Sequence, residues 1–181
     1  MENPYKRKKE PEVSKQLILA AAAEIGAKDW HLVTFQAIAD NTGLSKGGII
    51  HHFRNKEDLL KELMNQSLAE LTEWIIEEKK SSGNEVGSLA YLRFIIGKSN
   101  DLHYRRTMKI VMQVVLINEE YRKTWDEWSN LHIGNGDDTG QGIKYLIMML
   151  VADGLWYSDN LGIYNISDKN KQQVLETLIN L

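Results

Sequence analysis

Proline is confined to the first eleven residues of this chain, at Pro4 and Pro11. Proline interrupts helices because it lacks a backbone N–H and clashes with the preceding turn. From residue 12 to residue 181 no proline stands in the way of a helix. Hydrophobic residues make up 43% of the chain and recur at spacings of three and four, which is typical of amphipathic helices. We therefore expect an all-α protein.

The composition also excludes several kinds of site. The chain has no cysteine, so disulfides, thiolate catalysis and cysteine-based zinc sites are excluded. The longest apolar run, residues 145–152, is far shorter than the roughly 20 residues that span a bilayer. The first ten residues are charged and lack the apolar core of a signal peptide. We expect a cytoplasmic protein with no membrane association.

The apolar periodicity and the capping residues divide the chain into helices. The first helix, residues 11–27, is expected to bury the stripe formed by Val13, Leu17, Ile18, Ala21 and Ile25. Glycine and serine make residues 81–87 a predicted linker, and four glycines make residues 134–142 a predicted mobile loop. The other helices are expected after caps at Thr34, Ser45, Asn55 and Ser167, and at residues 89–96, 104–117, 120–133 and 143–161.

Charge is distributed unevenly along the chain. Residues 1–62 carry a net charge of +1, whereas the remainder carries −4. The basic residues at positions 6–9 form a cluster that suits contact with nucleic acid by the N-terminal end. The alternative for this cluster is a tail that only increases solubility.

Residues 34–60 have the pattern of a helix-turn-helix. A capped short helix supplies Ile38 and Ala39 for packing, and Ala39 is small where two helices cross. Gly43 makes the tight turn, Leu44 fills the gap between the helices, and a second short helix begins after Ser45. In DNA-binding proteins with this order, the second helix lies in the major groove and its first residues contact base edges.

The residues that we expect at DNA lie on this second helix and at the starts of its neighbours. Small residues let the backbone approach the duplex, and a lysine there can neutralise a phosphate or contact a guanine. Free N–H groups at helix starts can bind phosphates. The predicted DNA contacts are Thr34, Gln36, Ser45, Lys46, Gly47, Gly48, His51, His52 and Lys56.

Position by position, residues 14–62 resemble the signature of the TetR/AcrR family of transcriptional regulators. The resemblance implies an N-terminal three-helix DNA-binding domain and a C-terminal helical domain for ligand binding and dimerisation. The implied function is repression from a palindromic operator, relieved by a small apolar or amphipathic effector, with a cationic effector as one option. The matching positions are Leu17-Ile18, Ala20-Ala21, Gly26, Thr34, Ile38-Ala39, Gly43-Leu44-Ser45, Ile50, His52-Phe53 and Lys56-Glu57-Asp58-Leu59.

One departure from the family pattern affects DNA binding. The family usually has Tyr or Phe where Ile50 stands, and Gly48 replaces a frequent Thr. Ile50 cannot donate a hydrogen bond to a phosphate. We expect phosphate contacts to shift to His51, His52 or Lys56, whereas Phe53 is expected to pack inside the domain.

The C-terminal part is expected to hold the effector and the dimer interface, as the resemblance implies. Residues 143–161 are apolar on more than one face, so this helix needs a cover beyond its own domain. Aromatic and methionine side chains suit adaptable apolar pockets, and a carboxylate beside Trp suits a cation. The predicted ligand-binding residues are Phe94, Met112, Trp125, Trp128, Met148, Asp153, Trp156 and Tyr157, with Asp159 as an alternative carboxylate. Each aromatic or Met side chain is alternatively part of the core or the dimer seam.

This interpretation divides the chain into a basic arm (1–10), a helix-turn-helix domain (11–55) and a ligand-binding and dimerisation domain (56–181). We expect no enzyme, cofactor or metal, because no Gly-x-Ser-x-Gly or phosphate-binding loop is present and the five histidines are scattered. Adjacent His51 and His52 point to different sides of a helix, which is poor metal geometry. Two other interpretations are a helical ligand-binding protein with weak or no DNA binding, given Ile50 and Gly48, and an enzyme with an unrecognised site.

Overall fold

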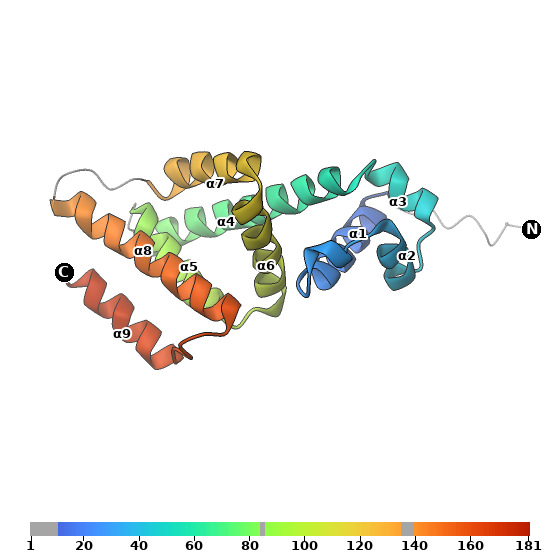
Figure 1. Ribbon diagram of the computed structural model, residues 1–181. Helices are drawn as coiled ribbons and strands as arrows, with labels where there is room; N and C mark the ends of the chain where they lie inside the picture. The colour runs from blue at the N-terminus through green and yellow to red at the C-terminus, as the bar shows by residue number, and fades with distance from the viewer. Residues whose placement is uncertain (1–10, 84–85, 135–139) are drawn as a thin grey trace, which may run out of the picture. The chain divides into compact units, whose positions relative to one another are not determined.

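The computed structural model describes residues 11–83, 86–134 and 140–181. Within these residues the chain is helical and has no β-strand, which confirms the expected all-α fold (Figure 1). The chain forms two compact units, and the boundary between them in the sequence lies between Asn65 and Gln66. The predicted basic arm, residues 1–10, and most of the predicted loop at 134–142 lie outside the described residues.

The first unit contains three short helices and the beginning of a long one. Two of the short helices follow side-chain caps, and the long helix α4 continues beyond Asn65 into the second unit. The elements are α1 (Pro11–Gly26), a 3-10 turn η1 (Trp30–Leu32), α2 (Phe35–Thr42), α3 (Lys46–His52) and α4 (Lys56–Ser82).

Helix α1 buries only part of the stripe that its periodicity predicts, including Ile18 and Ala21. Ile18 is fully buried, together with Leu19 and Ala22, whereas Val13 is 54% and Leu17 48% exposed. The prediction of Val13 and Leu17 as core residues is therefore wrong. The reason is that both α2 and α3 pack on α1, so the buried face is set by these neighbours and is rich in small alanines.

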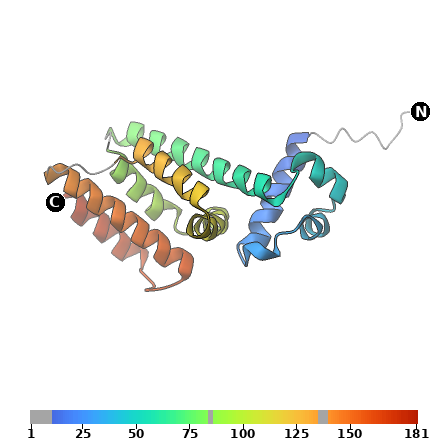
Figure 2. The same cartoon turned by 45° about the horizontal axis from the view of Figure 1, so that its top comes forward.

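The second unit contains five further helices. α5 lies against α8 over most of its length, and α8 and α9 run side by side in opposite directions (Figures 1 and 2). The helices are α5 (Gly87–Lys98), α6 (Leu102–Ile117), α7 (Glu119–His132), α8 (Gly140–Leu161) and α9 (Asp168–Ile179).

The helices on either side extend into the predicted linker at 81–87. α4 extends to Ser82 and α5 begins at Gly87. A Cβ atom at Gly87 would lie 2.4 Å from the carbonyl oxygen of His132, so a glycine is needed for this close approach to the end of α7. The glycine here therefore serves packing within the second unit.

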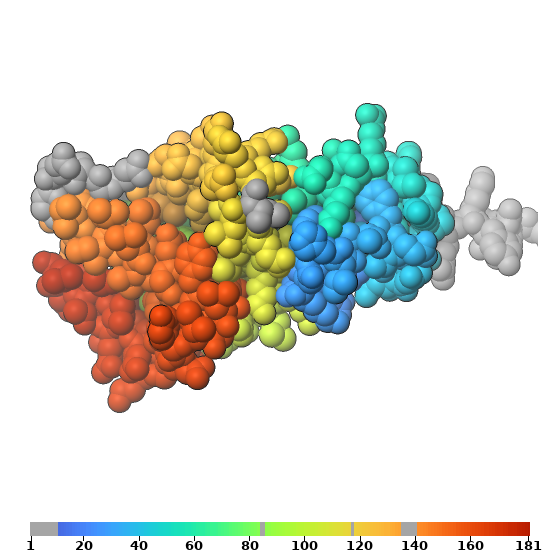
Figure 3. Space-filling view, in the orientation of Figure 1, coloured from blue at the N-terminus to red at the C-terminus, as the bar shows by residue number. Residues whose placement is uncertain are grey.

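Helix α8 is apolar on two faces, as its sequence predicts. Met148, Ala152 and Leu155 are buried within the second unit. The opposite face leaves Leu150 57% exposed. Figure 3 shows α8 (orange) and α9 (red) next to each other on the visible surface of this unit. The exposed apolar residues of α8, which we call the α8 stripe, are Ile143, Ile147, Leu150, Tyr157 and Leu161.

None of the described helices is both long enough and apolar enough to cross a membrane.

Candidate functional site

The turn between α2 and α3 is built by local hydrogen bonds. The hydroxyl of Thr34 accepts from the backbone N–H of Ala37 at 3.0 Å and begins α2. Gly43 ends α2 with φ at +70°, a conformation that costs other residues roughly 1–2 kcal/mol. The hydroxyl of Ser45 accepts from the N–H of Gly48 at 3.1 Å and begins α3. All three predicted roles are confirmed.

Packing within the first unit fixes which face of α3 is free. Ile38 and Ile49 are completely buried and Phe53 is 3% exposed, which confirms Phe53 as a packing residue. α3 therefore turns its other side outward, where Lys46 is exposed and Ile50 is 46% exposed. Of the predicted DNA contacts, Thr34, Gln36, Ser45, Lys46, Gly47 and His51 are exposed, and Gly48, His52 and Lys56 are half-buried.

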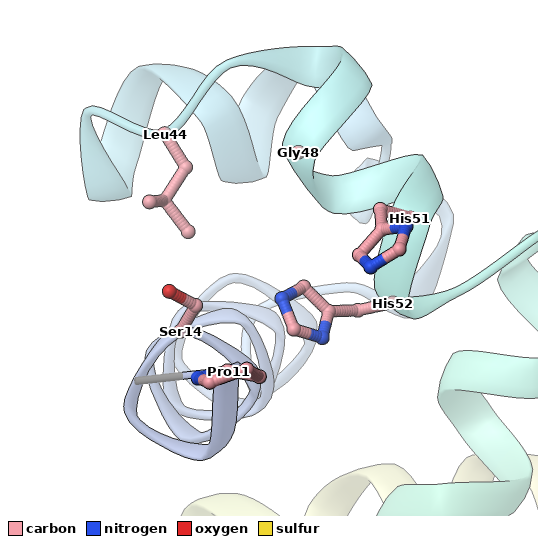
Figure 4. A pocket seen from close by; sticks show the side chains of 6 residues that line it. All are labelled: Pro11, Ser14, Leu44, Gly48, His51 and His52. Carbon is pink, nitrogen blue, oxygen red and sulfur yellow. The ribbon is translucent and has the colours of Figure 1, made fainter. Parts of the chain in front are cut away.

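A hollow of about 310 Å³ lies between the start of α1 and α3. Figure 4 shows the His52 ring pointing from α3 toward Pro11 and Ser14, with Leu44 directed into the same space. The His51 and His52 rings meet edge to face with their centroids 5.7 Å apart and line the same hollow, so the expectation that they point to different sides of the helix is wrong. Among the described residues no carboxylate lines this hollow, so its imidazole and hydroxyl groups suit an anion better than a cation.

Lys56 is used inside the first unit rather than directed outward. Its ammonium donates to the carbonyl oxygen of Trp30 at 2.6 Å and lies 4.5 Å from the centre of the Trp30 ring. Burial lowers the pKa of Lys56. Lys56 therefore anchors η1 to the start of α4. The side-chain oxygen of Asn55 caps this helix by accepting from the backbone N–H of Asp58 at 2.7 Å. Nothing near Lys56 in the sequence indicates its contact with Trp30, which lies 26 residues earlier.

The aromatic residues among the predicted ligand-binding residues fall into one cluster and a separate ring group, while two methionines and Asp153 lie outside both. Trp125 stacks on Trp156 with ring centroids 6.0 Å apart, and Trp128 lies 5.4 Å from Trp125. Tyr157 meets Trp156 edge to face at 5.0 Å. We call these four residues the tryptophan cluster. Trp128 is also fixed by its indole N–H, which donates to the hydroxyl of Thr72 at 2.8 Å.

Phe94 belongs to the separate ring group. It contacts Trp74 and Tyr104, with ring centroids 5.7 Å and 5.2 Å away. These rings line a small pocket of about 60 Å³ between α4, α5 and α6. Met112 and Met148 are buried and lie in neither ring group, nor do they line this pocket.

Asp153 is half-buried on α8, one turn before Trp156 and Tyr157. Its carboxylate accepts a hydrogen bond from the hydroxyl of Tyr91 at 3.0 Å. Burial raises the pKa of Asp153, although the Tyr91 hydrogen bond opposes this shift. Tyr91 is 1% exposed and was not predicted, because it lies 62 residues from its partner and no local pattern links them.

The alternative carboxylate, Asp159, is already neutralised. The ammonium of Lys171 lies 2.8 Å from both of its carboxylate oxygens, and the Lys171 residue is 4% exposed. Arg105 donates to the backbone carbonyl of Asp159 at 2.7 Å. Asp153 is thus the better anchor for a cation. Among the described residues no three or more of His, Asp or Glu are placed to hold a metal ion.

Comparison with known families identifies both units. The model of the tetR family of bacterial regulatory proteins matches residues 17–63, and that of the tetracyclin repressor-like C-terminal domain matches residues 88–181. The protein belongs to the tetR family. It is a DNA-binding transcriptional regulator of this family, with an N-terminal helix-turn-helix and a C-terminal ligand-binding domain. Regulators of this family are generally not enzymes.

Solved structures with similar folds share little sequence with this regulator. A putative transcriptional regulator from Pseudomonas aeruginosa PAO1 is 17% identical, covers 98% of this chain and 95% of its own, and has a TM-score of 0.71. A putative regulator from Saccharomonospora viridis in complex with choline is 19% identical, with coverage of 93% and 96% and a TM-score of 0.70. The multidrug binding protein EbrR complexed with malachite green is 13% identical, with coverage of 91% and 96% and a TM-score of 0.67. No curated protein matches this tetR-family sequence.

Proposed function

We propose that this regulator is a repressor that binds a palindromic operator as a homodimer and leaves it when a small effector binds. The observation that carries the proposal of DNA binding is the outward face of α3. Lys46 and Gly47 are exposed there, directly after the Ser45 cap that begins the helix. A lysine and a bare backbone at the start of a recognition helix suit contact with base edges and phosphates. The hollow beside His51 and His52 would accept a backbone phosphate, which Ile50 cannot bind.

The homodimer is supported by the α8 stripe. Its members recur at intervals of three, four and seven, so they lie on one side of α8. On the neighbouring helix, Ile179 is 39% exposed. A contiguous apolar face of this kind favours burial against a second copy, and two-fold symmetry would place α8 and α9 against their counterparts. The two recognition helices would then contact half-sites about one DNA turn apart or slightly more.

The effector site is supported by the clustered aromatic rings of the second unit. The tryptophan cluster and the pocket beside Phe94 offer apolar and π surfaces in a unit that matches a ligand-binding domain. Two proteins of similar fold are described as complexes with choline and malachite green, which are both organic cations. We propose a small apolar or amphipathic effector, with organic cations as the leading class.

Helix α4 supports a route for coupling. It is continuous from Lys56, beside the recognition helix, to Ser82, and Trp74 on this helix lines the pocket. A ligand that displaces the C-terminal half of α4 would change the spacing of the recognition helices and release the operator. Effector and operator must then weaken each other by the same factor, because binding free energies are reciprocal.

The test is to select duplexes that bind the purified protein from a random-sequence pool and to sequence them. We expect an enriched inverted repeat. Enrichment of a single half-site, together with a monomer in sedimentation, would overturn the dimeric part, and no enrichment would overturn the DNA-binding part.

A further inference from the structure

Asp153 is a half-buried acid that has no cationic partner among the described residues. None of the ion pairs formed by described lysines and arginines includes Asp153, and its carboxylate is bound by the neutral hydroxyl of Tyr91 at 3.0 Å. Burying a carboxylate without an opposite charge is costly. Asp159, six residues later on the same helix, shows the contrast, because Lys171 binds both of its oxygens. The second unit therefore retains one acidic group that a bound cation would stabilise.

Two buried polar atoms beside Asp153 also lack well-formed hydrogen bonds within the described part of the chain. They are the hydroxyl of Tyr104 and the indole N–H of Trp156, whose residues are only 8% and 6% exposed. An unsatisfied buried polar group destabilises the folded protein. Burial raises the pKa of Tyr104, the nearby Trp156 N–H opposes this shift, and the charge of Asp153 adds to it. Trp156 also lies one helical turn after Asp153 on α8, so their side chains are neighbours on this helix.

The chemistry of this neighbourhood favours one ligand class. The rings of Trp156, Trp125 and Tyr157 lie together, and aromatic faces attract cations. A bare metal ion is disfavoured, since it requires several oxygen ligands and one carboxylate is present. The indole N–H of Trp156 can only donate, and an acceptor oxygen on the ligand would satisfy it.

We propose that Asp153, Tyr104 and Trp156 recognise a small organic cation that carries an oxygen acceptor close to its charged centre. The proposal rests on the effector site of the proposed function and names the chemistry of its ligand. Asp153 and the aromatic faces bind the cationic centre, and the Trp156 N–H donates to the acceptor oxygen. Tyr104 also lines the pocket of about 60 Å³ between α4, α5 and α6.

Three probes separate charge from shape and from hydrogen bonding. Choline has both a quaternary ammonium and a hydroxyl, 3,3-dimethyl-1-butanol has the same shape without the charge, and tetramethylammonium lacks the hydroxyl. Each is titrated calorimetrically into the full-length protein without DNA. We expect choline to bind at least about tenfold more tightly than its neutral analogue, a difference of about 1.4 kcal/mol. Choline should also bind more tightly than tetramethylammonium.

Two variants assign these preferences to residues. Asp153→Asn should remove the preference for charge, whereas Trp156→Phe should reduce the preference for the hydroxyl and retain the preference for charge. Glu119→Gln is the matched control, because it removes one exposed carboxylate of the same unit, and it should change neither. Circular dichroism and thermal melting verify that each variant is folded, and the comparison of probes within the wild-type protein needs no variant at all.

The outcomes are separable from those for DNA binding. Equal affinity for choline and its neutral analogue, no saturable binding of choline, or an unchanged charge preference in Asp153→Asn would overturn the inference. Operator binding is measured on the same preparation without any probe. Operator binding without cation binding contradicts only this inference. Cation binding without operator binding contradicts the proposed repressor function.

Discussion

Lys46 is the exposed cation at the start of α3, and its role depends on the group that it touches. We expect Lys46→Ala to weaken operator binding by about 1–3 kcal/mol if it reads a base. If it binds only a phosphate, the salt dependence of log K should flatten by about 0.9 for each phosphate that the variant no longer neutralises. Fluorescence anisotropy across a salt series distinguishes the two. Lys28→Ala, which removes an exposed charge of the same unit outside α3, is the control, and an equal decrease in both variants would contradict a specific role.

Asp153 and Asp101 should respond oppositely to pH. Burial raises the pKa of Asp153 above its unfolded value, so its contribution to stability is present at low pH and lost as pH rises through the folded pKa. Asp153→Asn should therefore stabilise the protein at neutral pH and have little effect in acid. The hydrogen bond from Lys98 lowers the pKa of Asp101, so Asp101→Asn should destabilise at neutral pH, and this difference should vanish in acid. Urea unfolding at several pH values measures both, and a same-sign result would contradict these assignments.

At the scale of elements, the sequence predicts what is local. The caps at Thr34, Ser45, Asn55 and Ser167 are confirmed. They could be predicted because each hydrogen bond joins a side chain to a backbone N–H only three residues later. The buried face of α1 is predicted only in part, since it depends on helices that follow it. The Tyr91 bond to Asp153 and the Trp128 bond to Thr72 also escape prediction, as they join residues 62 and 56 positions apart.

The α8 stripe yields a prediction for the element as a whole. Leu150→Glu should place a charge in the proposed dimer interface and shift the protein toward monomer, because an unpaired buried charge is costly. Leu131→Glu is the control, since Leu131 on α7 is 77% exposed and lies outside the stripe. Analytical ultracentrifugation at micromolar concentration measures both variants. Dimers of equal strength in the two variants would contradict the assignment of the stripe to the interface.

At the scale of the whole molecule, we expect α4 to link two binding reactions. Binding of an effector in the presence of operator should be weaker than in its absence, by the same factor as the effector weakens operator binding. Such factors are typically about 5- to 150-fold, or about 1–3 kcal/mol. Titrating choline with and without the selected duplex measures the factor. Equal dissociation constants would show that choline does not release the operator, however tightly it binds.

Regulation by this protein depends above all on whether the exposed face of α3 reads a DNA sequence. The decisive experiment compares the affinity of the wild-type protein for the selected duplex with its affinity for a scrambled duplex of the same length and composition, at one physiological salt concentration. We predict a ratio of at least about 10³, which is the lower end for specific DNA-binding proteins. A ratio near one would contradict sequence reading by α3.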